Sequence, residues 1–298
     1  MRILVLGGGD GPERDVSLRS ASAVRDGLTD SVHDVRFCDP AGGEAALRLA
    51  VRQCDLIFPI LHGVGGEDGS IQRLLDDIGK PYLGSGEAVS RLCFDKPRLK
   101  QLLVENGIST PKSEVVTAET FGRSQLTQAP FVLKPIGGGS SLDIMIARAK
   151  PFDIGKAQGL LEKYDEMLLE ELILGDEITV PVLGDSALPV IEIVPPEGKE
   201  FDYENKYNGA TSELCPPRNI SAEVQKQAQR LAERVHALSG ARHLSRTDIM
   251  IDRAGTLYVL EINTLPGMTA QSLFPKSAAQ AGLPWTALME RLVDMAKG

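Results

Sequence analysis

Three oxygen-bearing side chains lie close together in the C-terminal part of the chain. Asp248 belongs to RTDIMID, and Glu261 and Asn263 end the apolar run TLYVLEIN. Alternation along a strand places Glu261 and Asn263 on one face. A two-residue turn at Ala254-Gly255 would place Asp248 opposite Glu261, although the sequence does not fix this register. Two carboxylates and an amide oxygen suit Mg²⁺. The spacing leaves open a hairpin whose polar residues only face solvent.

A second candidate is the run FVLKPIGGGSS, in which a strand delivers Lys134 to a glycine-rich loop. Glycines let backbone N–H groups approach an anion closely, and a lysine beside them adds positive charge. A P-loop has its lysine after the glycines, whereas this lysine precedes them, so the Walker motif is excluded. The run indicates a loop that covers phosphates, and an ordinary hairpin turn is the alternative.

Three further loops carry residues that could contact a small substrate. LGGGDGPERDVS lacks the dinucleotide-binding spacing because Pro12 stands where glycine is required, so we interpret it as a turn that offers Glu13 to an amine. In HGVGGEDG a strand ends in His62, and open α/β sheets bind ligands at the carboxyl ends of strands. The irregular segment FDYENKYNG offers Lys206 to a carboxylate and Tyr207 to a hydrogen bond. The alternatives are an exposed turn glutamate, a core histidine and a solvated loop.

Composition narrows the class of protein. The chain has 298 residues, enough for two or three compact units, with 42% hydrophobic and 24% charged residues, as in ordinary globular proteins. A net charge of -9 argues against nucleic acid as the main partner, because phosphate backbones need a basic footprint.

The cellular location can also be predicted. The start MRILVLGGGD lacks the long apolar core of a signal peptide, and no stretch is long enough to span a bilayer. Widely spaced cysteines without a C-x-x-C pair favour reduced thiols. These cysteines are Cys38, Cys54, Cys93 and Cys215. We therefore expect a cytoplasmic enzyme that does not contact a membrane.

The elements that position these residues form three units. Alternating strands and helices predict a doubly wound α/β domain over residues 1–86. Its expected strands are 2–6, 35–37, 55–61 and 82–83, and its expected helices are 17–28 and 71–79. Ser70 is expected to cap the second helix, and Gly79 to end it in the left-handed conformation.

The second domain is expected over residues 87–177 and the third over 178–298. In the second, Asp95 caps a helix over 96–106 that ends at Gly107. Its expected strands are 113–117, 131–134, 143–146 and 167–171. In the third, one face of a helix over 221–238 is apolar at helical spacing. Its expected strands are 178–184, 187–194, 246–252 and 256–263.

Seven motifs in order resemble the ATP-grasp ligases, and closely the D-alanine–D-alanine ligase family. They are GPERDVS, HGVGGEDGSIQ, PYLGSG, FDKPRLK, KYNGA, SRTDIMID and LEINTLPGMTAQSL, and the resemblance covers nearly the whole chain. It implies an α/β protein, with α+β central and C-terminal parts, that holds ATP between the central and C-terminal sheets.

The resemblance also implies site residues. The positions that correspond to nucleotide contacts are Lys96, Lys134, Glu170, Glu171, Leu172, Glu177 and Leu260. Two Mg²⁺ or Mn²⁺ ions would be held by Asp248, Glu261 and Asn263. The first D-alanine would be bound by Glu13 near His62, with Ser140 and Tyr207 completing a hydrogen-bonded triad. The second D-alanine's carboxylate would be held by Lys206, Ser272 and the backbone near Leu273. The oxyanion would be stabilised by Arg246 and the Gly267 N–H.

The chain departs from the family in one loop. Relatives often carry a charged pair there, as in SREGSS, whereas this chain has IGGGSS over residues 136–141. We expect looser closure of this loop, with Ser140 retained.

The implied reaction joins two D-alanines through an acyl phosphate at the expense of ATP, for peptidoglycan precursor synthesis. Tyr207 beside Lys206 resembles the dipeptide-forming branch, whereas relatives that use D-lactate tend to have a histidine in that loop. The family is commonly dimeric, so a homodimer is expected. Two other classes stay open: a nicotinamide-dependent oxidoreductase, from LVLGGGDG, and a catalytically silent nucleotide-binding module, from the altered glycine loop.

Overall fold

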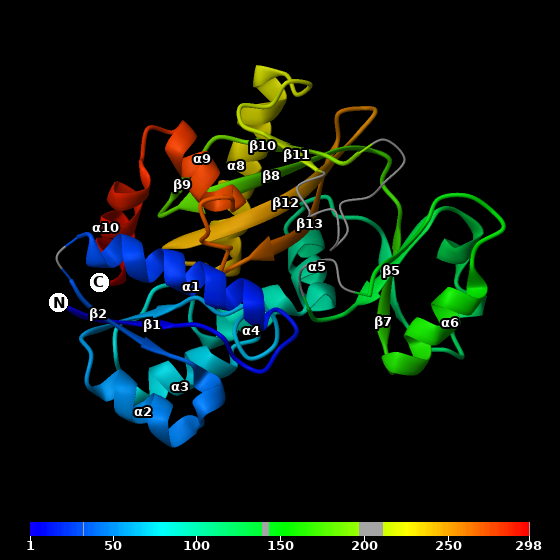
Figure 1. Cartoon of the computed structure of the whole chain (residues 1–298). Coiled ribbons are helices and arrows are strands. Elements are labelled where there is room, and N and C mark those ends of the chain that lie inside the picture. Colours follow the sequence, from blue (N-terminus) through cyan, green and yellow to red (C-terminus); the bar gives the residue numbers. More distant parts are fainter. Residues whose placement is uncertain (32, 139–142, 197–210, 298) are drawn as a thin grey trace.

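The computed structural model describes residues 1–31, 33–138, 143–196 and 211–297. Within these ranges the chain forms three β-sheets, of three, four and six strands. The three-stranded N-terminal sheet lies at the lower left of Figure 1, the four-stranded central sheet at the right, and the six-stranded sheet of the C-terminal half between and above them. No helix in the described part of the chain is long and apolar enough to cross a membrane.

The N-terminal sheet is parallel, in the order β2-β1-β3; β1 and β3 are buried on both faces, whereas the edge strand β2 is partly exposed. Ile3 and Val5 face α1, whereas Leu4 and Leu6 face α2 and α3. Because neither face meets water, β1 is apolar at every buried position, as a parallel strand with two covered faces requires. The elements are β1 (Arg2–Leu6), α1 (Arg14–Thr29), β2 (Asp34–Cys38), η1 (Pro40–Gly42), α2 (Glu44–Arg52), β3 (Leu56–Pro59) and α3 (Ser70–Ile78).

Two details of this unit differ from the sequence-based prediction. Ser70 is not the cap of α3; Gly69 precedes the helix, and the Asp68 Oδ1 accepts the Ser70 N–H at 2.9 Å. The predicted strand at 82–83 is reduced to a single parallel bridge between Ile57 and Tyr82. The left-handed stop at Gly79 is confirmed, with φ of 71°.

The core of this unit is completed by the C-terminal end of the chain. Helix α10 (Trp285–Ala296) buries Leu288, Leu292 and Val293 in the same cluster as Ile3 and Val5. Figure 1 shows α10 beside α1, with the two chain ends close together. Gly27 in α1 permits this approach, because a Cβ there would collide with the Trp285 indole.

The central sheet is antiparallel, in the order β4-β7-β5-β6, and one face packs on α6. Phe131 and Leu133 point into that core. Alternation therefore sends Val132 and Lys134 to the opposite face. Asp95 caps α5 as predicted, accepting the Arg98 N–H at 3.1 Å. The elements are α4 (Glu87–Phe94), α5 (Lys96–Glu105), β4 (Ser113–Val116), η2 (Phe121–Arg123), η3 (Gln125–Gln128), β5 (Phe131–Pro135), β6 (Met145–Ala147), α6 (Ile154–Lys163) and β7 (Met167–Glu171).

The third sheet runs β11-β10-β8-β12-β13, with β9 paired to β8. One face is covered by α8, which buries Ala228, Ala232 and Val235 against the strands. Its other face is turned toward the central sheet. The elements are β8 (Gly175–Leu183), β9 (Ser186–Ala187), β10 (Ile191–Val194), β11 (Ser212–Leu214), α8 (Ala222–Ser239), β12 (Leu244–Asp252), β13 (Leu257–Asn263) and α9 (Leu273–Gln280).

The β12–β13 hairpin pairs Asp248 with Glu261, as predicted, but the predicted two-residue turn is wrong. The Asp252 N–H donates to the Thr256 carbonyl, which leaves a three-residue loop. A bulge offsets this extra residue: Ile249 pairs with Val259 and Asp248 with Glu261, so Leu260 has no partner on β12.

The close contact between α1 and α10 can be tested with two Gly→Ala variants that should shift the unfolding temperature in opposite directions. Gly→Ala within a helix normally stabilises by roughly 0.5–1 kcal/mol. Gly27→Ala should instead lower the unfolding temperature, because Trp285 must move to make room for the added methyl group. Such overpacking typically costs about 1–3 kcal/mol of unfolding free energy. Trp285→Phe should recover part of that loss. The matched control is Gly159→Ala in α6, where nothing lies within 4 Å of an added Cβ, and it should raise the unfolding temperature. Equal shifts of one sign in thermal unfolding would contradict the close approach.

Candidate active site

A cavity of about 450 Å³ separates the central sheet from the C-terminal sheet. Its size lies in the range of small-molecule sites. Val132 lines one wall, and Met250 lines the other. Six of the predicted nucleotide contacts lie on this cavity: Lys134, Glu170, Glu171, Leu172, Glu177 and Leu260. The Leu172 N–H already donates to the Pro130 carbonyl at 3.1 Å, so its own amide is committed to the fold.

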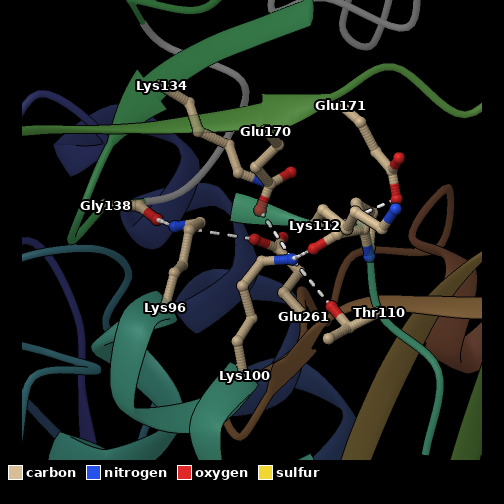
Figure 2. A network of polar contacts seen from close by, with 10 residues as sticks. Lys96, Lys100, Thr110, Lys112, Lys134, Gly138, Glu170, Glu171 and Glu261 are labelled. Atoms are coloured by element: carbon tan, nitrogen blue, oxygen red, sulfur yellow. Dashed lines mark hydrogen bonds and ion pairs between the residues drawn. The ribbon is translucent and has the colours of Figure 1, made fainter. Parts of the chain in front are cut away.

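A buried carboxylate between two lysines lies at the edge of this cavity (Figure 2). Lys134 on β5 and Glu170 on β7 are diagonal neighbours across the strand pair, with Nζ and Oε2 2.8 Å apart. The other oxygen of Glu170, Oε1, is 2.9 Å from the Lys100 Nζ of α5. Burial alone would raise the pKa of Glu170, but the two ammonium groups outweigh it and the pKa is lowered. Glu170 is therefore an ionised carboxylate.

Lys96, the seventh predicted nucleotide contact, lies outside that cavity and lines a smaller one beside it. Its Nζ donates to the Gly138 carbonyl at 2.8 Å and lies 3.6 Å from the Glu261 Oε2. Figure 2 shows Lys96 on the helix that also carries Lys100. The smaller cavity, of about 30 Å³, is also lined by Asn263 and has room for ordered water.

Two of the predicted metal ligands, Asp248 and Glu261, lie in one row across three strands, and the third, Asn263, pairs with Arg246 two residues along. Thr179, Asp248 and Glu261 are paired partners on β8, β12 and β13. The Thr179 hydroxyl donates to the Asp248 Oδ1. Arg246 donates to both Asp248 oxygens, at 2.9 and 2.8 Å. Burial alone would lower the pKa of Arg246, but Asp248 outweighs it and the pKa is raised, so the guanidinium is charged.

The predicted metal ligands are of the type that Mg²⁺ prefers, but they would fill its coordination sphere only together with oxygens of a bound substrate. Asp248, Glu261 and Asn263 supply carboxylate and amide oxygens, and the Asn263 Oδ1 is oriented by the Leu265 N–H at 2.8 Å. Among the described residues, no group of three or more His, Cys, Asp or Glu is arranged to hold a metal ion. Mg²⁺ usually binds one or two carboxylates plus substrate phosphates, and this donor set agrees with that pattern.

The predicted substrate contacts of the N-terminal unit, Glu13 and His62, lie near Glu67, which connects their loop to the predicted metal ligands. Glu13 is buried at the start of α1, and a Cβ on Gly63 would collide with its Oε2, so Glu13 contacts the loop that follows His62. Glu67 accepts the Gly63 N–H at 2.7 Å. Burial, and then the nearby Glu13 charge, raise the pKa of Glu67 to about 8. The charges of Glu261 and Arg246 also act on Glu67, so the loop lies beside the row of predicted metal ligands.

Gly267, Ser272 and Leu273 form a turn and the start of α9. The Ser272 Oγ accepts the Thr269 N–H at 3.0 Å, and a Cβ on Gly267 would lie 3.0 Å from that oxygen. Leu273 is the first residue of α9. A helix N-terminus offers N–H groups to a carboxylate, which agrees with the role predicted for Ser272 and Leu273.

Three predicted residues lie outside the described ranges: Ser140, Lys206 and Tyr207. The structure brings to the site two residues for which the sequence predicted no role, Lys100 and Thr179. A signal existed for Lys100, because it follows Lys96 by four residues, one helical turn, in KPRLK. Thr179 could be found only after the register of β8 on β12 was known.

Two antiparallel sheets that enclose a cavity lined by Lys134 define this chain as an ATP-grasp protein, a class of nucleotide-binding enzymes. Residues 41–85 match the family described as D-ala D-ala ligase N-terminus, and residues 102–294 match D-ala D-ala ligase C-terminus. The chain belongs to the D-alanine–D-alanine ligase family.

Named relatives match along nearly the full length. The D-alanine–D-alanine ligase of Gloeobacter violaceus is 42% identical over 303 residues, covering 99% of both chains. That of Nitratidesulfovibrio vulgaris is 41% identical over 298 residues, covering 99% of this chain and 98% of the relative.

Solved structures agree. The D-alanine–D-alanine ligase of Bacillus anthracis superposes with a TM-score of 0.88 at 31% identity, covering 99% of this chain and 97% of that one. Its complex with ATP gives 0.86 at 29% identity with the same coverage. A D-Ala:D-Ser ligase from Enterococcus faecalis gives 0.83 at 29% identity, covering 99% of each chain.

The raised pKa of Glu67 predicts a pH-dependent stability. The folded protein binds this proton more tightly than the unfolded chain, whose carboxyl has the ordinary value of 4.5. The contribution of Glu67 is thus fully present below 4.5 and is lost as the pH rises through about 8. Without metal, Glu67→Gln should match the wild type in unfolding temperature at low pH and exceed it at pH ~9.

Thermal unfolding in a chelator at several pH values measures this difference. Glu162→Gln, which neutralises an exposed carboxylate of α6, is the matched control and should run parallel to the wild type. A Glu67→Gln curve that also runs parallel would exclude a raised pKa.

Proposed function

We propose that this chain is an ATP-dependent ligase that joins two D-alanines into D-alanyl-D-alanine, a precursor for peptidoglycan. The observation that carries the proposal is the cavity between two sheets, lined by Lys134 and lying near the paired carboxylates Asp248 and Glu261, in a chain 42% identical to such a ligase over 99% of both lengths. The ATP-bound relative of the same fold supports ATP as the co-substrate.

ATP would lie in the cavity between the sheets. All five predicted contacts of the nucleoside line this cavity. Glu170, Glu171 and Leu172 would border the adenine end, Glu177 the ribose, and Leu260 the face of the base. The phosphates would meet Lys134 and Lys96. Both ammonium groups are held before ATP arrives, by Glu170 and by the Gly138 carbonyl.

Two Mg²⁺ or Mn²⁺ ions are part of the proposal, with Asp248, Glu261 and Asn263 as their protein ligands. When bound, such ions neutralise charge on the phosphoryl group and align the attacking and leaving oxygens. The protein's part is to hold Asp248 and Glu261 opposite each other, with Thr179 and Arg246 fixing the rotamer of Asp248.

In the first step a carboxylate oxygen of one D-alanine attacks the γ-phosphorus of ATP, and ADP leaves. Glu13, with Ser140 and Tyr207, would bind this substrate's ammonium group, and His62 would lie nearby. Glu13 is buried, so its attraction for an ammonium group is less screened than at the surface.

In the second step the amine of another D-alanine attacks the acyl carbon, the amide bond forms, and phosphate leaves. Arg246 and the Gly267 N–H would stabilise the oxyanion. Preorganised donors of this kind are typically worth ~2.7–4 kcal/mol of barrier. Ser272, the N–H groups near Leu273, and Lys206 would hold the second carboxylate.

The domain boundaries, the oligomeric state and the cellular location are also part of the proposal. Domains span residues 1–86, 87–177 and 178–298, supported by one sheet in each region. A homodimer follows only from the resemblance. A cytoplasmic location is supported by free thiols at all four cysteines and by the need for ATP.

The deciding experiment is a coupled assay of ADP formation with D-alanine, L-alanine, D-serine and D-lactate. D-alanine should be active alone, and the D-Ala–D-Ala product should be seen by mass spectrometry. D-serine tests the specificity of the Enterococcus faecalis relative, and D-lactate tests depsipeptide formation. ADP release that does not depend on any of these substrates would contradict the proposal.

Glu261→Gln should reduce kcat by roughly 10²–10³ with little change in unfolding temperature, because it removes one electrostatic partner of the phosphates. The Mn²⁺ signal in electron paramagnetic resonance should show weaker binding in the presence of ADP. The control is Glu166→Gln, which neutralises an exposed carboxylate directly before β7 and should behave as wild type. Unchanged Mn²⁺ binding by Glu261→Gln would remove Glu261 from the set of metal ligands.

A further inference from the structure

Lys100 is a buried lysine of the site that does not reach the cavity. It lies one helical turn after Lys96 on α5 and is 4% exposed. Its Nζ donates to the Thr110 Oγ1 at 2.7 Å and to the Pro111 carbonyl at 3.0 Å, and it lies 2.9 Å from the Glu170 Oε1. Figure 2 shows it below Glu170, on the opposite side from Lys134. A buried ammonium group is costly, so its retention beside the ATP cavity requires a reason.

The charges of this cluster give that reason. Lys134 and Lys100 each carry +1 and Glu170 carries −1, so the three buried groups have a net charge of +1. Lys134 paired with Glu170 alone would form a neutral pair. The positive charge that the triphosphate should meet would then be cancelled within 2.8 Å of its source.

We propose that Lys100 is a positioning residue for ATP: its ammonium group forms an ion pair with one oxygen of Glu170, so that Glu170 fixes the Lys134 ammonium without cancelling its charge toward the triphosphate. Glu170 then acts on ATP through Lys134, in addition to bordering the adenine end of the cavity. The inference rests on the proposed contact between Lys134 and the phosphates.

The titration of the cluster agrees with this geometry. Glu170 stays ionised in spite of its burial. Burial lowers the pKa of Lys100, Glu170 raises it again, and the neighbouring Lys134 charge lowers it further. The single negative charge of Glu170 therefore neutralises only one of the two ammonium groups, and an anion bound in the cavity would neutralise the remaining positive charge.

The test is a double-mutant cycle on ATP affinity. Wild type, Lys100→Met, Glu170→Gln and the double variant are titrated calorimetrically with a nonhydrolysable ATP analogue and Mg²⁺. Lys100→Met should raise the Kd roughly ten- to a hundredfold, the worth of one charged hydrogen bond. Most of that loss should be absent when Lys100→Met is combined with Glu170→Gln, because no carboxylate then draws Lys134 away from the phosphates.

Two controls separate this effect from damage to the fold. Adenosine, which has no phosphates, should bind Lys100→Met as it binds the wild type. Lys112→Met removes an exposed lysine just after Pro111 and should leave the Kd of the ATP analogue within about twofold. Loss of adenosine binding by Lys100→Met, or an equal loss of analogue affinity with and without Glu170→Gln, would show that Lys100 acts through packing and would overturn the inference.

Lys134→Met distinguishes this inference from the proposal on which it rests. If it binds the analogue as tightly as the wild type, the proposed phosphate contact of Lys134 is wrong. If Lys134→Met weakens binding and Lys100→Met does not, the phosphate contact stands and the role of Lys100 is wrong.

Discussion

The β-bulge at Leu260 is the constraint on which the site depends. The hairpin loop has one residue more than a two-residue turn, and without compensation Asp248 would lose its place opposite Glu261. The bulge restores that pairing and turns two consecutive residues to the same side. Leu260 reaches the large cavity and Glu261 the small one, while Val259 and Ile262 remain in the core. A side chain proposed to contact the base and a proposed metal ligand thus become neighbours.

Charge balance organises the groups around that hairpin. Glu170 is matched by two lysines, Asp248 by Arg246, and Glu261 is approached by Lys96. These three carboxylates, which would otherwise repel ATP, are therefore each paired with a cation fixed by the fold. Glu67 follows a different rule, since burial and its acidic neighbours favour its neutral form. The site is thus prepared for a polyanionic substrate before that substrate arrives.

The sequence predicted those features that depend on local pattern. Apolar runs located β1, β5 and β7, and spacing from the hairpin turn placed Asp248 opposite Glu261. The predicted pairing was correct although the predicted turn was wrong. The loop has one residue more than predicted, and the bulge at Leu260 shifts the register back by one residue. The helices α2, α4, α6, α9 and α10 were missed, since their apolar faces are completed only by distant strands. The burial of Lys100 and the raised pKa of Glu67 depend on what lies opposite them in space, which no local pattern contains.

The packing of α10 on the N-terminal sheet has a consequence for biosynthesis. Ile3 and Val5 are translated long before Leu288, Leu292 and Val293, yet all five residues share one core. The first sheet therefore keeps one apolar face incompletely covered until α10 has been translated. Contacts of such long sequence separation form slowly, and exposed apolar surface favours aggregation in the meantime. The nascent N-terminal unit is accordingly a segment whose apolar face a chaperone would have to shield until α10 packs on it.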